Sequence, residues 1–343
     1  MSREAYFAKV HTFIEHLDHL PDDGPAAQVK MNSVLMLSNE LMRVYQTCDM
    51  DPIPPLATVL DAQIEILRNT TWPKRQSESP QNPGDKQAVR HLYEQAWTSY
   101  DQRTYDHSLK LMEDRLRANG LDESFFKGKR CIDAGCGTGR FAIAMAKLGA
   151  ASVVGADIGV KSLAFARERA QERGVADRVE FMELDITNLS KFRDQEFDFV
   201  ASNGVLMCTG KCHAALREHF RVTKQGGLFW IYLYGANGIM WDTYDLLRTA
   251  MQGIGPDRAK AHMLAMDTRL GMVYTFLDNV FAPIRTYHGT QEVLDVLASV
   301  APTEARPQRG LSDVDDSVRQ TSSPYGALIY GDECEVRQIV TRK

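Results

Sequence analysis

Near its middle the chain runs Arg130-Cys131-Ile132-Asp133-Ala134-Gly135-Cys136-Gly137-Thr138-Gly139-Arg140-Phe141, a short apolar segment that opens into a glycine-rich loop. The pattern predicts a buried strand over 130–134, then a turn, then a helix that Gly149 ends. Glycines let such a turn approach a ligand closely, and the helix N-terminus offers free N–H groups to an anion. Arg140 stands where a dinucleotide-binding motif has its third glycine. We therefore expect a nucleoside ligand without a diphosphate, with a ligand-free tight turn as the alternative for the glycine pattern alone.

Further apolar runs of strand length follow, and three of them lead into a polar residue. Asp157 ends the run 152–157, about twenty residues after the loop, the distance at which a second strand brings a carboxylate to a ribose. Asp185 lies near the end of the run 179–186, and Asn203 follows the run 197–202. A fifth run, over 227–232, follows the turn residues Gln225 and Gly226. This order predicts an open α/β sheet with a ligand at the carboxyl ends of its strands, although a single such acid is usually a solvated helix cap.

The acid and glycines of 133–139, with the acids at the next two strand ends, resemble the class I S-adenosylmethionine-dependent methyltransferases. The resemblance covers residues 129–234. It implies a Rossmann-like seven-stranded sheet that binds S-adenosylmethionine and releases S-adenosylhomocysteine. It also implies that Asp157 accepts hydrogen bonds from the ribose hydroxyls, while Asp185 and Ile186 hold the adenine.

In related enzymes a helix before the first strand folds over the cofactor, so Tyr100 and Tyr105 are candidates for a lid, with core packing as the alternative. The resemblance implies a cofactor site made of Tyr100, Tyr105, Asp133, Gly135, Cys136, Gly137, Thr138, Gly139, Asp157, Ile158, Asp185, Ile186 and Asn203.

At 343 residues the chain exceeds a minimal methyltransferase core, so the flanking segments need their own interpretation. Residues 1–72 hold three helical patterns and predict an N-terminal appendage, for which homodimer formation or packing is favoured over acceptor recognition. The polar, proline-punctuated segment 73–85 indicates a linker to the cofactor-binding core, 86–234.

The segment after the core departs from a minimal methyltransferase. Residues 235–300 predict a helical cap insertion that covers the acceptor, and residues 301–343 predict an irregular loop followed by a closing β-hairpin, with strands at 326–330 and 336–341. The cap is rich in aromatic and methionine side chains, which suits an adaptable apolar cleft but is also common in helix cores. Its candidate acceptor-binding residues are Asn237, Trp241 and Tyr244.

The expected chemistry makes a dedicated base optional. A sulfonium methyl is already activated, so alignment of the reactants accounts for much of the rate, and only a hydroxyl acceptor needs a base. His213 and Tyr234 are the candidate catalytic residues, with a helix cap or surface position as the alternative for His213. The segment Ser202-Asn203-Gly204-Val205 lacks the Asn/Asp-Pro-Pro-aromatic motif with which related enzymes hold planar amino groups. Methylation of DNA, rRNA and glutamine amides is therefore disfavoured.

Composition narrows the class of protein. The net charge of −5 gives no electrostatic reason to expect nucleic acid as a partner. No run approaches the roughly eighteen apolar residues that span a bilayer, and no signal core follows Met1, so we expect a cytoplasmic protein without a membrane partner. The six cysteines do not suggest a disulfide framework. Because Cys208 and Cys212 lack a second ligand pair, no metal site is expected.

The sequence thus predicts methyl transfer from S-adenosylmethionine to an O or N atom of a small molecule, such as a biosynthetic intermediate. A protein or tRNA methyltransferase and a catalytically silent S-adenosylmethionine-binding subunit are the alternatives.

Overall fold

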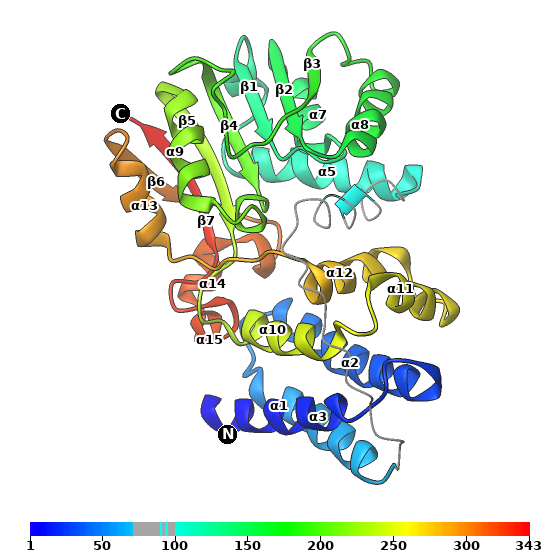
Figure 1. The fold of residues 1–343 in the computed structure, drawn as a ribbon. Coiled ribbons are helices and arrows are strands. Elements are labelled where there is room, and N and C mark those ends of the chain that lie inside the picture. The colour runs from blue at the N-terminus through cyan, green and yellow to red at the C-terminus, as the bar shows by residue number, and fades with distance from the viewer. Residues whose placement is uncertain (71–89, 91–92, 95–99) are drawn as a thin grey trace.

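The computed structural model describes residues 1–70, 90, 93, 94 and 100–343 (Figure 1). The predicted linker, 73–85, lies outside the described residues, as does most of the segment 86–99. Within the described ranges, none of the helices is long and apolar enough to cross a membrane. The cytoplasmic location stays a prediction.

A seven-stranded sheet forms the upper half of the molecule in Figure 1, with strand order β3-β2-β1-β4-β5-β7-β6. Strands β1 to β5 are parallel, and β7 runs antiparallel to both β5 and β6. The chain moves outward from β1 to β3 and then returns to β4 on the other side of β1, which confirms the predicted Rossmann-like fold. The strands are β1 (Arg130–Ala134), β2 (Ser152–Asp157), β3 (Val179–Glu183), β4 (Phe197–Asn203), β5 (Thr223–Leu233), β6 (Thr303–Pro307) and β7 (Val336–Arg342).

Helices cover both faces of this sheet, which explains why its central strands are apolar on both sides. In β1, Cys131 packs into the core shared with α7, whereas Ile132 packs into the core shared with α9. One face carries α5 (Gln102–Ala118), α6 (Glu123–Phe126), α7 (Arg140–Lys147) and α8 (Val160–Glu172). The other carries the 3-10 turn η1 (Leu206–Cys208), α9 (Cys212–Val222) and α13 (Thr290–Ala298).

A second, helical layer lies below the carboxyl ends of the strands (Figure 1). It combines the three predicted N-terminal helices with the predicted cap insertion. The N-terminal helices are α1 (Arg3–Asp18), α2 (Gly24–Tyr45) and α3 (Ile53–Arg68). The remaining members are α10 (Ile239–Met251), α11 (Pro256–Ala265), α12 (Leu270–Phe281), the 3-10 turn η2 (Asp313–Asp315), α14 (Ser317–Ser322) and α15 (Gly326–Tyr330).

The N-terminal helices and the cap share one core, although the sequence predicted them as separate segments. Buried polar pairs join them: the Tyr6 hydroxyl lies 2.9 Å from Thr243 Oγ1, and Ser38 Oγ lies 2.7 Å from the Tyr244 hydroxyl. The Tyr45 hydroxyl donates to Glu335 Oε1 at 2.5 Å, which links α2 to the residue before β7. The N-terminal helices and the cap therefore bury part of their surface against each other. A homodimer through the N-terminal helices stays a prediction.

The predicted closing hairpin is wrong in one of its two strands. Residues 326–330 form the helix α15, and β7 pairs instead with β6, in a segment predicted to be irregular. A short apolar run fits a strand or a helix equally well, so contacts outside the run decide. Here the Tyr330 hydroxyl donates to the Tyr45 carbonyl at 2.6 Å, and the two rings pack edge to face. The sequence does not predict β6, because this strand is mostly exposed, lies at the edge of the sheet and ends in a proline.

Two strand boundaries also differ from the prediction. β3 ends at Glu183, so Asp185 and Ile186 lie in the loop beyond it. β5 begins at Thr223 and includes Gln225 and Gly226, which were predicted as a turn. The pairing register of β4 with β5 shifts at this point, and Gly226 has a φ of 73°, so the strand continues through an irregularity.

We predict that Tyr45→Phe lowers the free energy of unfolding by about 1–3 kcal/mol, because the buried Glu335 carboxylate loses a hydrogen-bond donor. Urea unfolding followed by circular dichroism measures the change. Met36→Ala, on the exposed face of the same helix, is the matched control and should stay within about 0.5 kcal/mol of the wild type. Equal stabilities of the two variants would contradict the assigned link between α2 and the sheet.

Candidate active site

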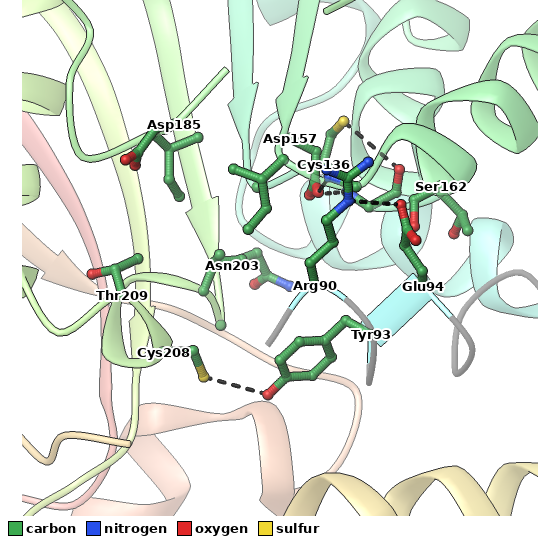
Figure 2. A pocket seen from close by; sticks show the side chains of 18 of the residues that line it. Arg90, Tyr93, Glu94, Cys136, Asp157, Ser162, Asp185, Asn203, Cys208 and Thr209 are labelled. Carbon is green, nitrogen blue, oxygen red and sulfur yellow. Dashed lines mark hydrogen bonds and ion pairs between the residues drawn. The ribbon is translucent and has the colours of Figure 1, made fainter. Parts of the chain in front are cut away.

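A pocket opens at the carboxyl ends of the parallel strands, between the sheet and the helical layer (Figure 2). The carboxyl ends of all five parallel strands contribute to its wall, as the strand order allows. Most of the predicted cofactor residues line it, namely Gly135, Cys136, Gly137, Thr138, Asp157, Ile158, Asp185, Ile186 and Asn203. The structure thus brings together residues that lie up to 68 positions apart in the sequence, from 135 to 203.

The glycine loop has a conformation that other residues rarely adopt. Gly135, Gly137 and Gly139 have φ angles of 86°, 51° and 78°. A Cβ on Gly135 would lie 2.5 Å from a methyl carbon of Val205, whereas one on Gly137 would meet no atom within 4 Å. Gly135 is therefore required by packing, and the backbone at Gly137 is open to a ligand.

Asp157 holds this loop in place. Its Oδ2 accepts the Gly137 N–H at 2.8 Å, and its Oδ1 accepts the Gly159 N–H at 2.8 Å. Burial raises the pKa of this carboxyl, against the opposing effect of the two backbone donors. The acid that was expected to contact a ribose thus also joins the loop after β1 to the loop after β2.

Thr138 offers an unsatisfied group to the pocket. Its buried Oγ1 has no hydrogen-bond partner among the residues that the structure describes. Buried hydroxyls are normally paired, so this one is placed to bind a ligand or a water molecule. The Thr138 carbonyl accepts the Tyr105 hydroxyl at 2.8 Å.

Four of the predicted cofactor residues do not line the pocket. Tyr105 is buried behind the loop, and the Tyr100 ring lies 5.7 Å from the Arg140 guanidinium, so the structure does not place either ring over the cofactor site. Gly139 precedes α7, where a Cβ would lie 2.7 Å from the Phe181 ring. Asp133 Oδ2 accepts the Ala142 N–H in the first turn of α7 at 3.0 Å. These residues support the loop from behind, a role that the motif alone does not distinguish from ligand contact.

Two strand-end polar residues have fixed orientations. Asp185 Oδ1 accepts the backbone N–H and the hydroxyl of Thr187, at 3.0 and 2.7 Å. Asn203 Oδ1 accepts the Trp230 indole N–H at 3.1 Å, which assigns the amide oxygen to Trp230 and leaves the NH₂ group on the pocket side (Figure 2).

One end of the pocket contains residues that the sequence did not predict as site residues. The Tyr93 hydroxyl donates to Asp278 Oδ1 at 2.7 Å, and Cys208 Sγ lies 3.4 Å from the same hydroxyl (Figure 2). Tyr234 and Ile284 complete this part of the wall. Burial raises the pKa of Asp278 above its usual range and that of the Cys208 thiol to about 11. Asp278 is a carboxylate in an otherwise apolar helical pattern, which is the signal that could have identified it.

Arg285 holds this end of the pocket from behind. Its Nη2 donates to the carbonyl oxygens of Asp278 and Asn279, at 2.7 and 3.0 Å, in the last turn of α12. Its guanidinium lies 5.6 Å from the centre of the Tyr234 ring and 5.0 Å from that of Trp241. A cation at the C-terminus of a helix is favourable, so Arg285 stabilises the turn that carries Asp278.

Of the predicted catalytic and acceptor residues, only Tyr234 lines the pocket. His213 is exposed, with Nε2 2.5 Å from Glu292 Oε1, and Asn237 donates to Asp332 at 2.6 Å. Trp241 stacks behind Tyr234 at 3.9 Å, and Tyr244 is buried against α2. The expectation that the cap's aromatic face forms the pocket wall is thus corrected. Helical spacing identifies a buried face but not its partner, which here is the N-terminal bundle.

Comparisons with known proteins find similarity in the middle of the chain. Residues 125–248 match a family described as methyltransferase domain. Methyltransferase phqN of Penicillium fellutanum is 32% identical over 124 residues, which are 35% of this chain and 35% of that protein. The ubiquinone biosynthesis O-methyltransferase of Pseudomonas fluorescens strain SBW25 is 35% identical over 113 residues, 33% of this chain and 47% of that protein. The chain thus spans less than half the length of either relative.

Among solved structures, an S-adenosylmethionine-dependent methyltransferase of Thermotoga maritima is 17% identical, with a TM-score of 0.43. The match covers 74% of this chain and 100% of that one.

We predict that Asp133→Asn changes how stability depends on pH. Burial raises the pKa of Asp133 from 3.8 to about 7, so the folded wild type loses stability as the pH rises from about 4 to 7. Asparagine keeps an oxygen for the Ala142 N–H but cannot ionise. The variant should therefore gain stability relative to the wild type between pH 5 and pH 8, as measured by urea unfolding at both values.

Asp122→Asn provides the control, because hydrogen bonds from Ser124 and Phe125 lower the pKa of that half-buried side chain. It should show no relative gain between pH 5 and pH 8. If the stability of Asp133→Asn differs from that of the wild type by the same amount at both pH values, Asp133 does not titrate in this range.

Proposed function

We propose that residues 125–248 form a class I S-adenosylmethionine-dependent methyltransferase domain. On this premise, the chain methylates an O or N atom of a small molecule that binds beside Asp278. The observation that carries this proposal is the continuity of the pocket. One wall contains the glycine loop and the strand-end acids, and the other contains Tyr93, Tyr234 and Asp278.

The residues present fit S-adenosylmethionine. The open backbone at Gly137 and the unpaired Thr138 hydroxyl suit its polar amino-acid portion. The Asp157 carboxylate suits the ribose diol, because a carboxylate oxygen can accept further hydrogen bonds beside its backbone donor. Asp185 and Ile186 suit the adenine. When bound, the cofactor supplies a sulfonium methyl group that is already activated for transfer.

The groups at the far end of the pocket suit recognition and deprotonation of the acceptor. Asp278 would accept the proton from an acceptor O–H or N–H, since burial makes this carboxylate a stronger base than usual. Tyr93 would fix the carboxylate through its 2.7 Å hydrogen bond. The pKa of Tyr234 lies well above its ordinary value because of burial, so its phenol stays protonated and would donate a hydrogen bond. These roles replace the one predicted for His213.

A small-molecule acceptor is favoured over a protein or tRNA because Asp278 lies within the pocket wall beside Tyr93 and Cys208, not on an open face. The net charge of −5 also gives no attraction for RNA.

We predict that Asp157→Ala weakens S-adenosylmethionine binding by on the order of 2 kcal/mol, about 30-fold in Kd, because both a ribose acceptor and the brace of the glycine loop are lost. Isothermal titration calorimetry measures the affinity. Asp177→Ala, at a highly exposed acid elsewhere in the same domain, should leave Kd unchanged. An unchanged affinity in a folded Asp157→Ala protein would remove this placement of the cofactor.

The acceptor class is tested by incubating the protein with S-adenosylmethionine labelled in its methyl group and with small-molecule, protein and RNA fractions of a cell extract. We expect label in the small-molecule fraction. Label confined to protein or RNA would contradict the proposal, and tight cofactor binding without labelling of any fraction would favour a catalytically silent subunit.

With an acceptor in hand, we predict that Asp278→Asn lowers kcat by about 100-fold while the cofactor Kd stays within about twofold of the wild-type value, because only the proton acceptor is lost. Asp267→Asn, at an exposed acid of the cap, is the matched control and should retain full turnover. Retained turnover in Asp278→Asn would assign the deprotonation step elsewhere.

A further inference from the structure

Three side chains with metal-ligating atoms meet outside the pocket. His213 lies in the first turn of α9, His288 lies beside the end of β5, and Glu292 lies in the first turn of α13. Their ligand atoms all lie within 4.8 Å of one another, and no other such group occurs in the ranges that the structure describes. Glu292 Oε1 is 2.5 Å from His213 Nε2 and 3.2 Å from His288 Nδ1. Neighbouring ligand atoms of a tetrahedral Zn²⁺ lie roughly 3.4 Å apart, so small side-chain shifts would bring all three around one ion.

The hydrogen bonds of His288 determine which of its nitrogens faces this group. Thr286 Oγ1 lies 2.9 Å from His288 Nε2 and 3.2 Å from the Met207 carbonyl oxygen. This contact occupies Nε2, so the other ring nitrogen faces the group. His288 Nδ1 lies 3.2 Å from Glu292 Oε1.

Hydrogen bonds also orient the Glu292 carboxylate. Glu292 Oε2 accepts the Gly289 N–H at 3.1 Å, which leaves Oε1 to the two histidines. A second carboxylate, that of Glu333, accepts the backbone N–H of Gln291, the residue before Glu292, at 2.8 Å. Glu333 therefore adds negative potential beside the three ligating side chains. Supporting hydrogen bonds of this kind orient metal ligands and raise their basicity.

We propose that His213, His288 and Glu292 bind a divalent transition-metal ion, Zn²⁺ being the ion that two imidazoles and one carboxylate suit, with water completing the coordination. The site joins α9 to α13. It also lies against the pocket wall, because the Thr286 hydroxyl that orients His288 bonds to Met207, the neighbour of Cys208. The ion therefore has a structural role and fixes η1 from outside the pocket. The proposal does not depend on the methyl-transfer reaction.

The full chain, freed of metal with a chelator, is titrated with ZnCl₂ in a calorimeter at neutral pH. We expect one equivalent to bind. His213→Ala and Glu292→Gln should each weaken binding at least tenfold through loss of a ligand, and Thr286→Val about tenfold through loss of the group that orients His288. His262→Ala, which removes a histidine of α11 that contacts Asn32, is the matched control and should not change the affinity.

Substitution with Co²⁺ gives a second readout. Visible absorption bands of tetrahedral Co²⁺ should appear in the wild type and disappear in folded His213→Ala. If the wild type binds no Zn²⁺ at micromolar concentrations, the proposal is overturned. Equal affinity of the wild type and of both ligand variants, each folded by circular dichroism, would also overturn it.

Discussion

The structure of the pocket depends on one buried carboxylate. Asp157 accepts backbone N–H groups from Gly137 and Gly159, so a single side chain at the end of β2 joins two loops that leave neighbouring strands. Burial of a charge is costly unless donors surround it, and these two amides offset that cost. In return the glycine loop keeps three left-handed residues in one arrangement. The contacts of Asp157 therefore fix the relative position of the two loops that form this pocket wall.

The opposite wall depends on the helical layer. Asp278 is in the last turn of α12, where Arg285 binds the terminal carbonyl oxygens and lies over the rings of Tyr234 and Trp241. Trp241 and Tyr244 belong to α10, which packs on the N-terminal helices through Tyr6 and Ser38. The first seventy residues thus support the pocket indirectly, since they bury the side of the cap that faces away from it. This arrangement explains why Trp241 and Tyr244, which the sequence predicted to bind the acceptor, pack inside the protein instead.

Local patterns were sufficient for the parallel part of the sheet and for half of the pocket. The strands β1, β2 and β4, the loop at 135–139 and the acids at 157 and 185 follow from short apolar runs and their spacing, because the end of a parallel strand fixes where the next residue lies. The same reasoning failed for 326–330, where five apolar residues are compatible with either regular structure and a contact with Tyr45 selects the helix. It also failed to separate ligand-lining residues from supporting ones such as Asp133 and Tyr105.

The sequence by itself determined the fold of the core and most residues of the proposed cofactor side, since both lie in contiguous segments with periods and spacings that physical chemistry constrains. Only the tertiary structure decided which residues form the proposed acceptor side. Tyr93, Cys208 and Asp278 are 185 positions apart at the extremes and belong to no common motif. Likewise His213, His288 and Glu292 meet because α9 and α13 pack side by side. Helical periodicity indicates which face of a helix is buried, but the choice of partner for that face is a property of the whole chain.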